Sequence, residues 1–179
     1  MSPAERSDAA RSRALILDAA RAADPGALRL NEVARSAGVG VGTVYRHFPT
    51  VHALIEAVVA DDLEKYRELA RAASAEPDPL RALEVLVTRG LALQLADGGL
   101  QTVLLAEQDT APETAALKQD LQALASEIIA AAQESGSIRS DLTTTRLMHL
   151  VCGIERAARI GGGDPGFYAE VLLAGIRER

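Results

Sequence analysis

The hydrophobic residues of this chain recur with the period of an α-helix along almost its whole length. Apolar positions three and four residues apart mark successive segments, and glycine, proline or a polar cap separates each segment from the next. The longest apolar stripe consists of Leu54, Ile55, Val58, Val59, Leu63, Tyr66 and Leu69. The pattern predicts about nine helices, over residues 11–23, 31–37, 41–47, 51–74, 79–96, 100–107, 111–135, 143–160 and 167–177.

Short polar signals predict several of the helix ends. Asp78-Pro79 combines an N-cap with proline at the first helical position. Thr110 and Glu113 have the spacing of a capping box, which predicts that a helix begins there, and Gly136 is expected to end it.

The composition supports an all-α fold. Hydrophobic residues make up 48% of the 179 positions and aromatic residues only 3%, and the apolar fraction is mostly the helix formers Ala and Leu. No apolar run is long enough for a transmembrane helix, and the first residues do not resemble a signal peptide. The single Cys152 excludes an intramolecular disulfide, so we expect a cytoplasmic protein with no membrane contact.

The net charge of −6 is unevenly distributed along the chain. Residues 1–50 contain seven arginines and five acidic residues and carry a charge of +2, whereas residues 51–179 carry −8. Because a nucleic-acid surface must be basic, any such surface is expected in the first third of the chain.

Two short predicted helices, 31–37 and 41–47, follow a longer one and are joined through Gly38. This arrangement is typical of a helix-turn-helix, whose turn has three or four residues and often contains glycine. Gly38 suits a backbone with positive φ, and Val39 is expected to pack between the helices. The second helix could then enter a DNA major groove, roughly 12 Å wide.

The residues from Ala37 to Thr50, AGVGVGTVYRHFPT, resemble the DNA-binding domain of TetR-type repressors. The segments ILDAA at 16–20 and LNEVA at 30–34 extend this resemblance, which covers about residues 11–58. It implies a helix-turn-helix DNA-binding domain over residues 1–50 and a helical effector-binding and dimerisation domain over residues 51–179.

The resemblance also implies which residues contact double-stranded DNA. Thr43, Tyr45 and His47 would bind phosphates, and such contacts fix register without reading sequence. Arg46 would lie near the base edges and could read guanine or hold a phosphate. The full expected set is Arg29, Val41, Gly42, Thr43, Tyr45, Arg46 and His47. The open alternatives are a surface His47, a Tyr45 that caps the domain core and a solvated Arg46, while Val44 and Phe48 are expected to pack inward.

Two positions depart from the family pattern. Arg29 stands where Ser or Thr usually caps the second helix, and Val51 stands where Lys or Arg is common. Arg29 could still reach a phosphate, and backbone N–H groups at the start of the next helix could bind the phosphate that a basic side chain at position 51 would otherwise hold. We therefore expect modest DNA affinity with a shallow salt dependence.

The resemblance implies that residues after 50 hold an effector pocket and a homodimer interface. The expected pocket residues, for which packing in the core is the alternative, are Tyr66, Leu86, Leu93, Val103, Leu124, Ile128, Met148 and Cys152. The scarcity of aromatic residues favours a small or aliphatic effector. The expected interface residues are Gly153, Val171 and Gly175. Glycine inside a helix costs about 1 kcal/mol relative to alanine, and close helix approach would explain its presence, with relaxed surface composition as the alternative.

No motif indicates an enzyme or a cofactor. The chain has no glycine-rich phosphate loop followed by lysine, no Gly-x-Ser-x-Gly elbow and no His-Glu-x-x-His. His149 and Cys152 share a helical face, but three histidines and one cysteine give no complete set for a zinc ion, so no metal is expected. The sequence thus predicts a ligand-controlled dimeric repressor; the alternative is a DNA-binding regulator with a vestigial pocket controlled by a partner protein.

Overall fold

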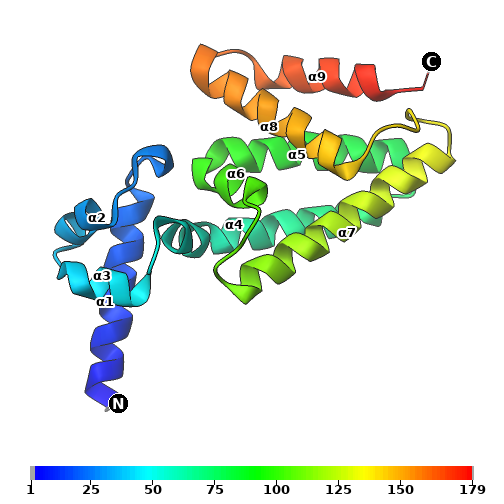
Figure 1. Ribbon diagram of the computed structural model, residues 1–179. Helices are drawn as coiled ribbons and strands as arrows, with labels where there is room; N and C mark the ends of the chain where they lie inside the picture. The colour runs from blue at the N-terminus through cyan, green and yellow to red at the C-terminus, as the bar shows by residue number, and fades with distance from the viewer. Residues whose placement is uncertain (1–2, 179) are drawn as a thin grey trace. The chain divides into compact units, whose positions relative to one another are not determined.

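In a computed structural model, residues 3–178 form nine α-helices and one short 3-10 helix, with no strand among them (Figure 1). This confirms the predicted all-α fold. The elements are α1 (Pro3–Arg21), η1 (Pro25–Ala27), α2 (Leu30–Ala37), α3 (Val41–His47), α4 (Val51–Ser74), α5 (Pro79–Ala96), α6 (Gly98–Leu105), α7 (Pro112–Glu134), α8 (Thr144–Gly161) and α9 (Pro165–Ile176).

The chain divides into two compact units. The first comprises Met1–Asp61 and Gly98–Ala115, and the second comprises Asp62–Asp97 and Ala116–Arg179. The long helix α4 begins in the first unit and continues into the second. None of the helices that residues 3–178 form is long and apolar enough to cross a membrane.

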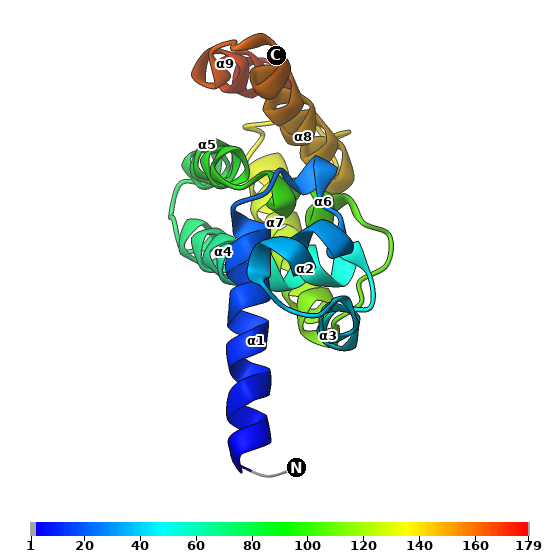
Figure 2. The same ribbon diagram turned by 90° about the vertical axis from the view of Figure 1, so that its left-hand side faces the viewer.

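Helices α1, α2 and α3 pack against one another in the first unit (Figure 2). Their apolar faces supply its core, because the helical periodicity of each sequence gathers the large aliphatic side chains on one side. The buried residues are Ile16, Ala20, Leu30, Val33, Ala34, Val44 and Phe48. This small core holds the two short helices α2 and α3 against the longer α1.

The carboxylate of Glu56 holds the start of α7 within the same unit. It accepts hydrogen bonds from the backbone N–H groups of Thr110, at 2.6 Å, and Ala111, at 2.8 Å. The predicted capping box was therefore wrong: Glu56, and not Glu113, takes the Thr110 N–H, and α7 begins at Pro112. The buried side chain of Glu56, from α4, thus takes the place of a local cap.

The second unit is built around contacts among α5, α8 and α9. A short backbone bridge holds the end of the chain: the Arg139 N–H donates to the Ile176 carbonyl, and the Glu178 N–H donates to the Ser137 carbonyl. Gly136 ends α7 with a φ of 70°, as predicted.

Several helix boundaries differ from the sequence-based expectation, and α9, for example, begins at Pro165 and not at residue 167. Helix α1 begins at Pro3, eight residues before the expected start. The sequence did not predict this first part of the helix because residues 3–10 are mostly small or polar and show no apolar stripe. Helix α6 begins at Gly98 although Gly98-Gly99 was expected to separate two helices. Gly99 is buried within this helix.

Candidate nucleic-acid interface

Gly38 forms the turn between α2 and α3. Its φ of 66° lies in the left-handed region, and its N–H donates to the carbonyls of Ala34 and Arg35. The next residue, Val39, is half-buried and donates its N–H to the Ala34 carbonyl. The predicted turn is confirmed, and it closes α2 with the backbone bonds of a glycine C-cap.

Helix α3 has one buried side and one exposed side. Val44 is completely buried and packs inward together with Phe48, as expected. On the other side Val41 is 46% exposed and Tyr45 is 48% exposed. Both side chains are therefore accessible to a binding partner on this face of the helix.

Arg46 lies along its own helix. Its Nε donates to the Gly42 carbonyl at 3.2 Å, and its Nη2 donates to Thr43 Oγ1 at 3.1 Å. Both bonds are solvent-exposed, so DNA could compete for the guanidinium at little cost. The structure thus brings Gly42, Thr43 and Arg46 together on the exposed surface of α3.

His47 closes α3 beside the aromatic ring of Phe48, with ring centroids 6.2 Å apart. The Arg13 guanidinium from α1 lies 4.8 Å from the Phe48 ring centroid, in a cation–π contact. Burial, followed by the positive charges of Arg13 and Arg46, lowers the pKa of His47 below its ordinary value. Its imidazole is therefore neutral at pH 7 and can donate one hydrogen bond.

The two positions that depart from the family pattern lie at helix starts. Arg29 is the exposed N-cap of α2 and makes no side-chain capping bond. Val51 is the first residue of α4, where Thr50 Oγ1 accepts the Ala53 N–H at 3.0 Å. The start of α4 thus has a hydroxyl cap. The backbone N–H groups that precede Ala53 in this helix have no carbonyl partner within the helix.

The expected pocket residues are distributed over five helices. Tyr66 lies on α4, Leu86 and Leu93 on α5, Val103 on α6, Leu124 and Ile128 on α7, and Met148 and Cys152 on α8. Four of them, Leu86, Val103, Ile128 and Cys152, are buried, and the other four are half-buried. Val103 belongs to the first unit and the remaining seven to the second.

Tyr66 and Cys152 meet at a buried glutamine that the sequence interpretation missed. Gln94 is 1% exposed; its Nε2 donates to Tyr66 Oη at 3.5 Å, and its Oε1 accepts from Cys152 Sγ at 3.7 Å. Burial raises the pKa of Tyr66 to about 12. The only signal in the sequence that could have identified Gln94 was its position as a single side-chain amide inside the apolar stripe of residues 79–96.

An ion pair between a buried carboxylate and an exposed arginine lies close to this cluster on α8. Glu155 is 1% exposed and pairs with Arg159, whose Nη2 also donates to the Gln94 carbonyl at 2.9 Å. The second carboxylate oxygen, Glu155 Oε2, is buried without a hydrogen-bond partner. Glu155 was also missed, although it follows Cys152 by one helical turn.

Leu93 lies elsewhere, in an open surface groove between α4 and α5. The groove has a volume of about 350 Å³ and is lined by Lys65, Leu69, Arg89, Ala92 and Leu93. Of the expected pocket residues, this groove therefore includes Leu93 alone.

Helices α8 and α9 carry several exposed apolar side chains. Phe167 is 58% exposed and Val171 is 55% exposed, and Leu150 and Ile160 are also exposed. Gly153 and Gly175 lie inside these helices, and an added Cβ would meet no atom within 4 Å at either position. Contacts within one chain therefore do not account for the two glycines.

Two family models match the sequence. "Bacterial regulatory proteins, tetR family" matches residues 16–58, and "Transcriptional regulator SbtR-like, C-terminal domain" matches residues 78–178. Together they cover the helix-turn-helix and most of the remaining helices. No curated protein matches the chain.

Several solved structures are similar to this chain. A TetR transcription regulatory protein from Mycobacterium vanbaalenii is 33% identical, with 96% of this chain and 98% of that chain covered and a TM-score of 0.47. A TetR transcriptional regulator from Streptomyces coelicolor is 28% identical, with 93% and 98% covered and a TM-score of 0.56. FadR from Bacillus subtilis, solved in complex with stearoyl-CoA, is 14% identical, with 93% and 98% covered and a TM-score of 0.59, and shares the fold.

Proposed function

This chain belongs to the TetR family of bacterial transcriptional regulators, and we propose that it is a repressor that binds a pseudo-palindromic operator as a homodimer and leaves it when a small molecule binds. In this proposal residues 1–50 hold the DNA and residues 51–179 hold the effector and the partner copy. The protein acts by binding, and no catalytic step is assigned to it.

The exposed face of α3 carries the proposal. Tyr45 presents a phenol hydroxyl and Val41 an aliphatic side chain to solvent, while Val44 anchors the opposite side in the core. Thr43 and Arg46 add a hydroxyl and a guanidinium to the same short helix. Hydroxyls and a cation are the groups that hold phosphates, and an aliphatic side chain can contact a thymine methyl group.

The exposed apolar residues of α8 and α9 support a homodimer. A surface that includes Phe167, Val171, Leu150 and Ile160 is costly to leave in water, and a two-fold axis lets one patch cover itself. Gly153 and Gly175 would allow close approach of helices from two copies. A dimer would then present two α3 helices about one DNA turn, roughly 34–36 Å, apart.

Effector control is supported by the polar groups within the helical second unit. Tyr66, Gln94 and Glu155 are hydrogen-bonding groups among aliphatic side chains, the usual composition of a ligand site. The fold accommodates a ligand in at least one protein, since B. subtilis FadR was solved with stearoyl-CoA.

The close packing of the expected pocket residues favours an alternative in which a partner protein, and not a small molecule, controls the regulator. Leu86, Ile128 and Cys152 are buried, and the Tyr66 hydroxyl already accepts a hydrogen bond from Gln94. A regulator with such a filled core could be controlled by a partner protein. Thermal-shift screening with small molecules distinguishes control by an effector from control by a partner protein, because a ligand at 100 times its Kd adds about 2.7 kcal/mol of stability.

Capture of genomic DNA tests the proposed function. Sheared DNA from the source organism is incubated with the purified chain, and the retained fragments are sequenced. We expect enrichment of fragments that share one pseudo-palindromic sequence, and their neighbouring genes would suggest an effector. Retention of fragments with no shared sequence would contradict operator-specific regulation.

A further inference from the structure

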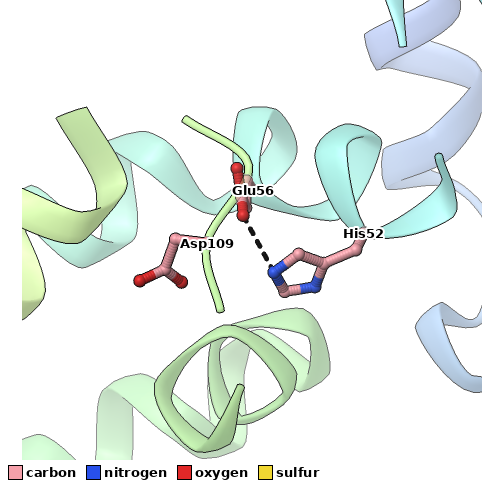
Figure 3. Close-up of side chains that lie close together, drawn as sticks. All are labelled: His52, Glu56 and Asp109. Carbon is pink, nitrogen blue, oxygen red and sulfur yellow. Dashed lines mark ion pairs between the residues drawn. The ribbon is translucent and has the colours of Figure 1, made fainter. Parts of the chain in front are cut away.

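His52, Glu56 and Asp109 bring three metal-ligating side chains together in the first unit (Figure 3). His52 and Glu56 are one turn apart near the start of α4, and Asp109 lies between α6 and α7. One ligand atom from each residue lies within 4.8 Å of the other two. Glu56 is buried, and the other two residues are half-buried.

The imidazole of His52 is close to Glu56 but does not make a hydrogen bond to it. His52 Nε2 lies 2.8 Å from Glu56 Oε1, within ion-pair distance, yet this buried nitrogen has no hydrogen-bond partner. Two ligands that share one ion at about 2.0–2.1 Å stand roughly 2.8–3.4 Å apart. The separation of these two atoms is therefore that of neighbouring ligands.

Glu56 is oriented by other groups, as metal-ligating carboxylates usually are. Its two oxygens accept the backbone N–H groups of Thr110 and Ala111, which hold the carboxylate in one position. Each carboxylate oxygen has a second lone pair, so Oε1 can accept the Thr110 N–H and still bind an ion.

We propose that His52, Glu56 and Asp109 bind a divalent transition-metal ion of the zinc or nickel class, with water completing its coordination. One imidazole and two carboxylates suit these ions better than magnesium or calcium, which prefer oxygen ligands alone. Asp109 would have to move by on the order of 1 Å to reach a shared ion. The bound ion would link α4 to the segment that precedes α7, in addition to the Glu56 bonds already there.

Metal titration of the full-length chain, with any affinity tag removed, tests this site without DNA or effector. Zn²⁺ and Ni²⁺ are titrated separately by calorimetry into protein stripped with chelator. We expect one ion per chain, a loss of affinity of at least tenfold in His52→Gln, and a similar loss in Asp109→Asn. His149→Gln removes an exposed histidine on α8 and is the matched control, expected to bind like the wild type.

Thermal melting provides the second measurement. Zn²⁺ is expected to raise the melting temperature of the wild type and of His149→Gln, and to leave that of His52→Gln unchanged. Asp109→Asn keeps the test valid if His52→Gln does not fold. The proposal is overturned if neither ion binds the wild type, or if the two ligand variants bind as tightly as it does. Operator binding is measured separately, so failure here leaves the proposed function intact.

Discussion

The phenol ring of Tyr66 lies directly against Gly90. A Cβ atom on residue 90 would stand 2.5 Å from Tyr66 Oη and 2.8 Å from its Cζ, closer than side chains tolerate. Gly90 lies inside α5, where glycine costs about 1 kcal/mol relative to alanine. The contact with the ring explains why glycine occupies this position in spite of that cost. A side chain at residue 90 would collide with the Tyr66 ring, whose hydroxyl accepts a hydrogen bond from Gln94.

Gly90→Ala should therefore destabilise the protein although alanine is the better helix former. We expect the free energy of unfolding to fall by about 1–3 kcal/mol, the range typical of overpacking, measured by urea denaturation. Gly161→Ala is the matched control, since it lies at the end of α8 and an added Cβ would meet nothing within 4 Å. Equal stability of the two variants would mean that Tyr66 moves aside at no cost.

Tyr45→Phe should weaken DNA binding to every sequence by a similar factor. The exposed Tyr45 hydroxyl is proposed to donate to a phosphate, and a hydrogen bond to a charged group contributes about 1.5–3 kcal/mol. A loss of at least tenfold is expected in fluorescence anisotropy with both operator and random duplexes. A loss confined to one base position would contradict the phosphate role.

Arg46→Ala is the contrasting control for that measurement. If Arg46 leaves Gly42 and Thr43 to read guanine, its removal relaxes preference at one base pair and leaves binding to random DNA nearly unchanged. A uniform loss would instead assign Arg46 to a phosphate.

Val171→Glu should convert the proposed dimer into a monomer. Val171 is exposed on α9, and a two-fold interface would bring the new carboxylate into an apolar patch on both copies. An unpaired buried charge costs about 3–5 kcal/mol. Light scattering after size-exclusion chromatography is expected to give a dimer mass for the wild type and a monomer mass for the variant.

Leu105→Glu controls for the added charge. Leu105 is exposed to a similar extent but lies on α6, away from the α8 and α9 patch in sequence, so this variant should remain dimeric. A wild-type monomer, or a Val171→Glu dimer, would refute the proposed interface.

His47 should make the folded protein less stable in mild acid. Burial and the nearby arginines lower its pKa from 6.5, so the unfolded chain binds the proton more readily than the folded one. Above pH 6.5 the protonation of His47 does not affect the free energy of unfolding. As the pH falls below 6.5, its protonation in the unfolded chain lowers the free energy of unfolding. His47→Gln is therefore expected to lose less unfolding free energy than the wild type between about pH 6.5 and 5.

Urea denaturation at the two pH values checks this expectation, because carboxylates titrate equally in both proteins. The same loss in wild type and variant would show that His47 does not contribute. Nuclear magnetic resonance gives an independent check: a His47 pKa at or above 6.5 in the folded protein would contradict the burial argument.

Local signals predicted the parts of the fold that depend on local chemistry. The turn at Gly38 and the Asp78 cap of α5 follow from backbone and side-chain preferences within a few residues. The contact of Glu56 with Thr110 joins residues 54 positions apart, and no local pattern contains it. The capping-box prediction was wrong for this reason, since a distant buried carboxylate provided the better acceptor.

The candidate sites divide in the same way. The residues of α3 are close in sequence, so their shared exposed face was predictable, while their roles toward DNA stay predictions. Gln94 and Glu155 become visible only when α4, α5 and α8 pack together, because a single polar residue in an apolar stripe does not reveal its partner. The approach of Asp109 to His52 likewise depends on tertiary packing.

The central claim, that the exposed face of α3 reads a specific operator, is tested most directly by the ratio of two affinities. Fluorescence anisotropy compares the enriched palindrome with the same base pairs in scrambled order, over a range of salt concentrations. We expect the palindrome to bind at least about 10³-fold more tightly, with both affinities falling as salt rises. Equal binding of the two duplexes at low salt would contradict the claim.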